Sequence, residues 1–312
     1  MQETYLVRAK LDMSWAFEEG DLEARFPKGL PVRFGPFVLA QSPNRSFYLE
    51  RLGLIDSALM EGLRPDDNYP ISILYVELRL EIEKEESPEE TADEMFEQLE
   101  AILRLFQDGN VFLRRHYYHT WQLEVGVLKK VFYLLPTPEK PEPATLYNRG
   151  LYKLDDKTLQ QFIGFFNSYW DIIHGKRQPI YNALSRFNSS YEKRSLGDRL
   201  IDLIVALEAL FGGRGGGNSL TYKVALRCSS FLYPPGEARA KAFKAIKKNY
   251  EDRSAMIHGD KIDAKHTGEE IDQLEEQVRR SITAFLEQHR KGYRINSGED
   301  LDELLFFGKG SP

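Results

Sequence analysis

The sequence predicts an α+β N-terminal domain followed by an all-α helical bundle. Several segments of residues 1–135 alternate apolar and polar side chains, as strands do, whereas a helical period dominates after residue 150. The segment 136–145 (PTPEKPEPAT) lies between them and contains four prolines, which neither helix interiors nor central strands accept. We therefore expect an α+β domain of residues 1–145, a helical domain of residues 150–292 and a C-terminal tail of residues 293–312.

The first half contains five segments rich in β-branched and aromatic residues that we expect to be strands. They are residues 5–15, 31–41, 46–53, 71–84 and 126–136. One helix is expected over residues 87–107, because Ser87, Pro88 and Glu90 provide an N-cap, a first-turn proline and a capping-box acid. Ten Asp and Glu residues lie between Glu81 and Glu100. They indicate a solvated helix face, with a site for a hard cation as the alternative.

The second half has the apolar periodicity of helices. We expect them over about residues 155–173, 179–191, 195–211, 219–233, 237–258 and 267–285. Ser195 and Ser219 are expected N-caps, and Thr267 with Glu270 makes a capping box. The segment 212–219 has the glycine content of a phosphate loop, but no strand precedes it and no Gly-Lys-Ser/Thr closes it. We interpret it as a flexible loop between two helices.

Residues 176–258 form a basic segment in an acidic chain. They contain fifteen Lys and Arg and seven Asp and Glu, a net charge of +8, while the whole chain has a formal net charge of −6. A basic segment can bind polyanions by pairing with phosphates and releasing counterions. Solvated helix faces carry the same residues for solubility, so both interpretations stay open at this point.

The chain lacks the sequence features of several other protein classes. Its N-terminus has no basic stretch followed by a long apolar run, so we expect no signal peptide, no membrane anchor and a cytoplasmic protein. The single cysteine, Cys228, can form neither an intrachain disulfide nor a thiolate zinc site, and its setting predicts a buried thiol. We expect neither a metal nor a cofactor.

Three segments of the helical domain carry a resemblance to a known family. RLIDLIVALEALFGG, LTYKVALRCSSFLY and YEDRSAMIHG follow one another in an order and spacing that resemble Apea-like HEPN domains. HEPN families share an Arg and a His separated by four to six residues, and here Arg253 and His258 enclose four. The resemblance covers about residues 150–290. It implies that the helical domain is a HEPN-type bundle.

The resemblance also implies an activity, a metal-independent endoribonuclease that cleaves RNA at a composite site in a homodimer. Arg253 and His258 are the candidate catalytic residues, because a guanidinium binds phosphate oxygens and an imidazole transfers protons near neutral pH. One histidine per chain does not supply both a general base and a general acid, whereas a two-fold dimer supplies both. Residues with expected supporting or RNA-binding roles are Ser254, Glu208 and Asp252, and Lys244, Lys247 and Lys248.

Three interpretations of Glu208 stay open at this stage. It orients Arg253, forms a structural salt bridge or faces solvent. The resemblance further implies a role in prokaryotic stress response or phage defence. We expect the N-terminal domain to recognise a trigger or regulatory partner, or to position the RNA.

Two alternatives accompany this hypothesis. The first is a catalytically silent HEPN module that binds RNA or a protein partner as a scaffold or sensor. The second is a nucleotidyl-transfer or hydrolytic enzyme centred on the N-terminal domain, for which the sequence offers no usable motif. Arg114 and His119 have the same separation as Arg253 and His258, but they lie among alternating aromatic residues typical of strands. We interpret that second pair as structural.

Overall fold

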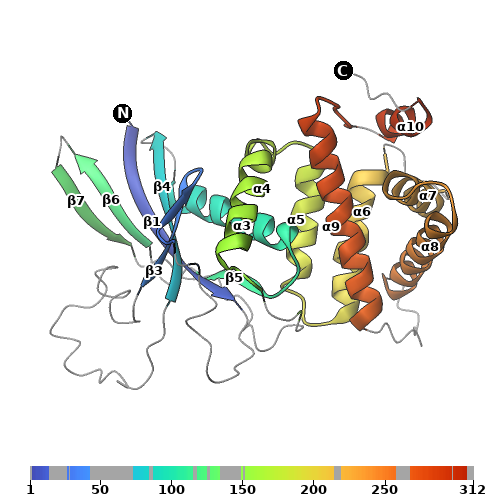
Figure 1. Ribbon diagram of the computed structural model, residues 1–312, viewed down its shortest axis with the longest axis horizontal. Coiled ribbons are helices and arrows are strands. Elements are labelled where there is room, and N and C mark those ends of the chain that lie inside the picture. Colours follow the sequence, from blue (N-terminus) through green and yellow to red (C-terminus); the bar gives the residue numbers. More distant parts are fainter. Residues whose placement is uncertain are drawn as a thin grey trace. The chain divides into compact units, whose positions relative to one another are not determined.

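The computed structural model describes most of the chain (Figure 1). The described residues are 2–13, 27, 29–42, 73–83, 87–114, 118–124, 127–133, 149, 152–213, 219–257, 268–296 and 298–307. The chain divides into two compact units. The first comprises Met1–Lys140 and Asn148–Asn167, and the second comprises Pro141–Tyr147 and Ser168–Pro312.

The first unit is built on an antiparallel sheet with the strand order β2-β3-β4-β1-β5. Its strands are β1 (Gln2–Met13), β2 (Val32–Phe34), β3 (Phe37–Ser42), β4 (Ile73–Glu83) and β5 (Val111–Arg114). A hairpin of β6 (Tyr118–Glu124) and β7 (Val127–Tyr133) forms a second sheet, and β6 runs close to β1.

Most of the predicted strands are confirmed. β1, β4 and β7 fall within or overlap the segments 5–15, 71–84 and 126–136. The segment 31–41 is not one strand but the hairpin of β2 and β3, because Gly35 turns the chain with a φ of 52° that glycine adopts without a Cβ clash. β5 and β6 lie outside the five predicted segments, although the residues around Arg114 and His119 were interpreted as typical of strands. The segment 46–53 lies outside the described residues.

Helix α3 (Pro88–Phe106) packs against β4, β5 and β1. The predicted N-cap is confirmed, because the Ser87 side chain accepts a hydrogen bond of 3.3 Å from the Glu90 amide. The predicted solvated acidic face needs one correction. Glu100 is fully buried and forms an ion pair with Arg104, which itself donates to the Val111 carbonyl at 3.2 Å. A charge buried in this way needs such a partner.

Seven further helices follow among the described residues. They are α4 (Asp156–His174), α5 (Ile180–Ser190), α6 (Leu196–Phe211), α7 (Leu220–Leu232), α8 (Glu237–Ile257), α9 (Gly268–Arg290) and α10 (Gly298–Phe307). The predicted helices are confirmed, and the predicted cap Ser195 accepts a hydrogen bond of 3.0 Å from the Asp198 amide. Ser219 precedes α7 at the N-cap position, but its side chain makes no capping hydrogen bond, so that part of the prediction is wrong. Thr267, the expected cap of α9, lies outside the described residues.

Helix α6 is the centre of the second unit. It packs against α5, α9, α8 and α7. Its apolar surface is wide, and Leu200, Leu203, Ile204 and Leu207 have no exposed surface. The glycine-rich segment 212–219 lies between two helices, α6 before it and α7 after it. This order is not the strand, loop and helix of a phosphate-binding loop.

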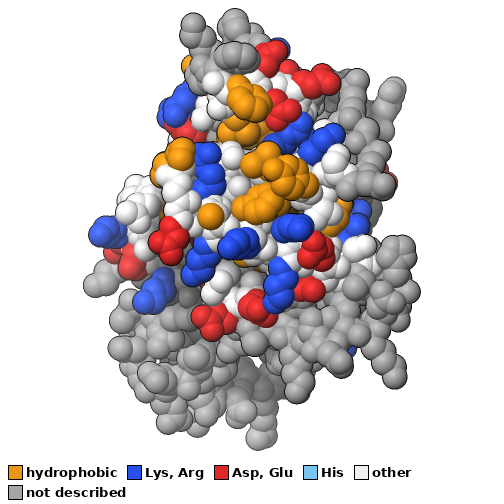
Figure 2. Space-filling view, turned by 90° about the vertical axis from the view of Figure 1, so that its right-hand side faces the viewer, with side chains coloured by type: hydrophobic (Ala, Val, Ile, Leu, Met, Phe, Trp, Pro, Cys, Tyr) orange, Lys and Arg blue, Asp and Glu red, His pale blue; other side chains and the backbone are white. Residues whose placement is uncertain are grey.

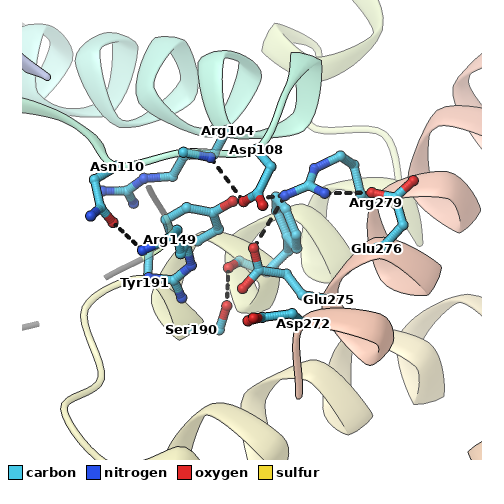
Figure 3. Close-up of polar contacts among 12 residues, drawn as sticks. Arg104, Asp108, Asn110, Arg149, Ser190, Tyr191, Asp272, Glu275, Glu276 and Arg279 are labelled. Carbon is cyan, nitrogen blue, oxygen red and sulfur yellow. Dashed lines mark hydrogen bonds and ion pairs between the residues drawn. The ribbon is translucent and has the colours of Figure 1, made fainter. Parts of the chain in front are cut away.

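A buried polar network joins α5, α6 and α9 (Figure 3). Arg199 on α6 is fully buried and donates to Glu275 on α9 at 2.7 Å. Arg279, one turn further along α9, donates to the other oxygen of Glu275 at 3.1 Å and to the Tyr191 hydroxyl at 2.9 Å. Paired charges of this kind fix the register of neighbouring helices, since removing one partner leaves a buried charge uncompensated.

The boundary between the units differs from the predicted one near residue 145. The first part of α4 belongs to the unit that contains the sheet, because its aromatic side chains pack on the β2–β3 hairpin. The rings of Phe162 and Phe166 meet Phe34 edge-to-face, with centroids 5.5 and 5.0 Å away. The predicted start of the helical domain, residue 150, thus lies within a segment that is compact with the sheet.

The predicted C-terminal tail contains helix α10, which packs on α6 and α7. Leu301 is fully buried there, and Arg227 on α7 donates to both carboxylate oxygens of Asp302 at 2.8 and 2.7 Å. The second unit thus extends beyond residue 292. No helix in the described part of the chain has the length and apolarity needed to cross a membrane.

Candidate active site

The C-terminal end of α8 carries the first residue of the predicted catalytic pair. The buried positions Ala242, Ile246 and Tyr250 recur every fourth residue, so they form one stripe that faces the neighbouring helices. Arg253 follows Tyr250 by three residues and continues this stripe. Its side chain is consequently only 23% exposed, although it lies in the last turns of the helix.

Arg253 pairs with Glu208 on α6. Nη1 of Arg253 lies 3.8 Å from Oε1 of Glu208, and the Glu208 side chain is 22% exposed. The structure therefore brings together two residues that the sequence separates by a glycine-rich loop and a complete helix. The screening of this pair by solvent is reduced, because both side chains are largely buried.

Tyr250 is a third member of this cluster. Its hydroxyl donates a hydrogen bond to the same oxygen of Glu208, and its ring centre lies 5.9 Å from Cζ of Arg253. Burial, and then the hydrogen bond to Glu208, raises the pKa of Tyr250 above its ordinary value of 10.0. Tyr250 therefore stays protonated and serves as a donor that fixes the carboxylate facing Arg253.

Sequence reasoning missed Tyr250, although a signal was present. Residues three apart on a helix face the same side, so a tyrosine three positions before the predicted Arg253 is placed to contact whatever that Arg contacts. We refer to Glu208, Tyr250 and Arg253 as the Arg253 cluster. Nε of Arg253 is buried and has no hydrogen-bond partner among the described residues.

Two predicted supporting residues lie beside the cluster in sequence. Asp252 and Ser254 flank Arg253 on α8, and both are half-buried. Their expected roles stay predictions.

The three predicted RNA-binding lysines are exposed on α8. Nζ of Lys247 lies 3.5 Å from Glu251, and Nζ of Lys248 lies 3.2 Å from Glu270 on α9. Exposed ion pairs of this kind contribute little to stability and exchange readily with other anions. Lys244 is exposed to solvent as well.

His258, the second residue of the predicted pair, lies outside the described residues, which end on this helix at Ile257. Of the predicted pair, only Arg253 can therefore be placed in the site. The competing pair is placed differently, since Arg114 ends β5 and His119 lies in β6 of the first unit. Its residues are thus on two strands, as expected from the sequence.

Cys228 on α7 is a buried thiol, as predicted. Its Sγ lies 3.6 Å from Oγ of Ser281, and burial raises the pKa of the thiol to about 12. A thiol that stays protonated is neither a nucleophile nor a metal ligand at neutral pH. Among the residues that the structure describes, no three His, Cys, Asp or Glu side chains are grouped as metal ligands would be.

No family model, curated protein or solved structure matches this chain. The chemistry of the Arg253 cluster follows from its own groups. A guanidinium carries five N–H donors, and the contact with one carboxylate oxygen leaves donors that can bind phosphate oxygens. The cluster thus presents a partly buried cation beside a carboxylate near the end of α8.

Proposed function

We propose that this chain is a HEPN-type endoribonuclease that cleaves RNA without a metal ion, at a site formed by Arg253 and His258. The observation that carries the proposal is the Arg253 cluster. A guanidinium that Glu208 and Tyr250 hold in place needs no rearrangement when charge develops on a substrate. Exposed lysines on the same helix supply the positive charge that attracts RNA.

In the proposed mechanism the ribose 2'-hydroxyl attacks the neighbouring phosphorus atom. One histidine removes the proton of this hydroxyl, and a second histidine gives a proton to the leaving 5'-oxygen. The products are a 2',3'-cyclic phosphate and a 5'-hydroxyl. Arg253 binds the phosphate oxygens and stabilises the charge of the phosphorane, a contribution of about 3 to 4 kcal/mol when the donor is preorganised.

The mechanism requires two chains, since each contributes one His258. A two-fold dimer places the two motifs opposite each other, because an isologous interface brings the same surface of each chain together. We propose that the helices around Arg253 form this interface. The resemblance to Apea-like HEPN domains supports the dimer and a role in prokaryotic stress response or phage defence. In that role the sheet-containing unit recognises a trigger.

The alternative is a catalytically silent HEPN module that binds RNA or a protein partner. One observation favours it, because a half-buried Arg with a carboxylate and an aromatic ring beside it also describes a structural Arg. The two functions differ in whether the wild-type protein cleaves RNA and in what the replacement of Arg253 then changes. Replacing Arg253 abolishes cleavage and preserves the fold if the residue is catalytic, whereas it costs only stability if the residue is structural.

The test is incubation of the purified protein with total RNA in EDTA, beside Arg253→Ala and His258→Ala variants. We expect the wild type to cleave RNA and the Arg253→Ala and His258→Ala variants not to, with unchanged far-UV circular dichroism for each variant. His119→Ala is the matched control, because it changes the histidine of the other pair with the same spacing. Full activity in the Arg253 and His258 variants, or cleavage that needs an added divalent ion, contradicts the proposal.

A further inference from the structure

An exposed apolar patch lies on the helices α7 and α8. Tyr222 and Leu226, one turn apart on α7, are 54% and 43% exposed. The ring of Phe243 on α8 meets the Tyr222 ring edge-to-face, with centroids 5.5 Å apart and an interplanar angle of 76°. We call Tyr222, Leu226 and Phe243 the aromatic patch. Figure 2, which shows the side of the molecule that carries these helices, displays apolar side chains with Lys and Arg, and also Asp and Glu, side chains around them.

The helices that carry the patch are unusually poor in acidic residues. α7 has none, and α8 has none between Ala238 and Tyr250. The same stretches contain the basic residues Lys223, Arg227, Arg239, Lys241, Lys244, Lys247 and Lys248. Several of these cations pair with acids, among them Lys247 with Glu251 and Lys248 with Glu270. Aromatic rings with exposed lysines beside them are complementary to nucleic acid, because bases stack on rings while phosphates pair with the cations.

Two lysines are placed to accompany a base on the patch. Lys223 follows Tyr222 and is exposed, and Lys247 lies one turn beyond Phe243 on α8. Lys247 pairs with Glu251 at 3.5 Å, but both side chains are about half exposed, at 47% and 59%. The pair is therefore weak and can be exchanged for a phosphate.

The aromatic patch and the Arg253 cluster share the helix α8. Phe243 and Arg253 are ten residues apart on one helix, about 15 Å along its axis. Lys247 and Ser254 lie within about 40° of Phe243 around that axis, so they form a strip that leads from the patch to the end of α8. A single strand of a few nucleotides spans this strip.

We propose that the aromatic patch binds single-stranded RNA, with a base stacked on Tyr222 and the following phosphates on Lys247 and along α8. The inference rests on the proposed function, for which it names a substrate class: unpaired RNA whose bases are free to stack. Double-stranded RNA does not satisfy this requirement, because its bases are stacked on one another and its backbone is read mainly by shape.

The test is fluorescence anisotropy with a labelled single-stranded oligonucleotide of about twelve nucleotides, long enough to fill such a site. Its riboses are 2'-O-methylated, so the 2'-hydroxyl that cleavage needs is absent. Tyr222→Ala should weaken binding about fivefold or more, the effect of removing one base–aromatic stack. Lys247→Gln should lower the slope of log affinity against log salt by about 0.7, the effect of removing one phosphate contact.

The chain offers matched controls for both variants. Phe306→Ala removes an aromatic side chain that is 82% exposed on α10, and Lys157→Gln removes an exposed lysine of α4. Both should bind the oligonucleotide as the wild type does. Wild-type affinity in Tyr222→Ala contradicts the proposal. So does a loss of self-association in that variant at unchanged RNA affinity, which makes the patch an interface between copies of the chain.

The outcomes for the patch and for the proposed function are separable. A protein that binds the oligonucleotide through Tyr222 but cleaves no RNA keeps the patch and loses the nuclease. A protein that cleaves RNA in EDTA, with the same binding and cleavage in Tyr222→Ala, keeps the nuclease and loses the patch. Unaltered far-UV circular dichroism of each variant shows that folding does not explain the loss.

Discussion

Deleting the Tyr250 hydroxyl is the sharpest test of the Arg253 cluster. Tyr250 is 7% exposed, and its hydroxyl donates to a carboxylate that is itself mostly buried. Hydrogen bonds to charged groups contribute about 1.5 to 3 kcal/mol when buried, and the partial exposure of Glu208 places this one near the lower end. We expect Tyr250→Phe to lower the free energy of unfolding by about 1 to 2 kcal/mol.

The assay is urea unfolding of wild type and variant, followed by far-UV circular dichroism. Tyr233→Phe is the control, because it also removes one tyrosine hydroxyl, whose partner Arg280 is bound at 3.0 Å in an exposed position. That change should cost within about 0.5 kcal/mol. Equal losses for Tyr250→Phe and Tyr233→Phe, or no loss for Tyr250→Phe, would refute the proposed geometry.

The difference in unfolding free energy between wild type and Tyr250→Phe should also depend on pH, and the pKa shift of Tyr250 gives the direction of that change. Since the folded protein raises the pKa of Tyr250 above 10.0, it binds the phenol proton more tightly than the unfolded chain does. The stability from this hydroxyl is therefore complete below pH 10 and is lost as the pH rises further. The difference between wild type and Tyr250→Phe should shrink above that pH. A difference that grows there would contradict the assignment.

Three further predictions concern the rest of the chain. Arg199→Met should lower the free energy of unfolding by on the order of 3 kcal/mol, because it removes a buried partner of Glu275; an unchanged urea midpoint would contradict this. Cys228 should resist a thiol-specific reagent in the folded protein and react fully after unfolding, and rapid labelling of native protein would show the thiol to be accessible. Hydrogen bonds, chiefly from Arg290, lower the pKa of Glu287 to about 2, so its stabilising effect should be present above pH 4.5 and disappear toward pH 2. Glu287→Gln should flatten the stability profile in that range, and an identical acid profile would count against the pairing.

The helices were predicted well because their N-caps and apolar periodicity depend only on residues that are close together in the sequence. Ser87 and Ser195 cap the helices that the sequence assigned to them, since an N-cap needs only its own next few residues. The split of residues 31–41 into β2 and β3 depends on a single residue, Gly35, whose positive φ turns the chain. A turn inside a run of apolar residues gives a weaker signal than a cap.

The partners of side chains could not be predicted from periodicity. The helix over about residues 155–173 was predicted from its apolar periodicity, but only the structure shows that its Phe162 and Phe166 pack on Phe34 of the sheet-containing unit. Glu100 was assigned to a solvated face because its neighbours are acidic, yet it is buried against Arg104. Spacing gives the face of a helix, whereas burial depends on what covers that face.

The candidate site was predictable in part. The family resemblance directed attention to Arg253, and the structure places Glu208 3.8 Å from it. This ion pair fits both an orienting role and a structural salt bridge. Tyr250 was missed because an apolar stripe normally places a tyrosine in the core without assigning its hydroxyl a partner. The contact of Tyr250 with Glu208 depends on which side of α6 packs against α8. The spacing of residues along α8 does not give that information.

The central claim, a composite site that requires His258 from two chains, is tested most directly by mixing. Wild-type and His258→Ala chains are mixed in varying ratios at constant total concentration under conditions of subunit exchange, and total RNA cleavage in EDTA is measured. A composite site predicts that total activity falls as the square of the wild-type fraction, because heterodimers retain one histidine. Activity that stays proportional to the wild-type fraction, or cleavage by a protein that light scattering shows to be a monomer, would contradict the account.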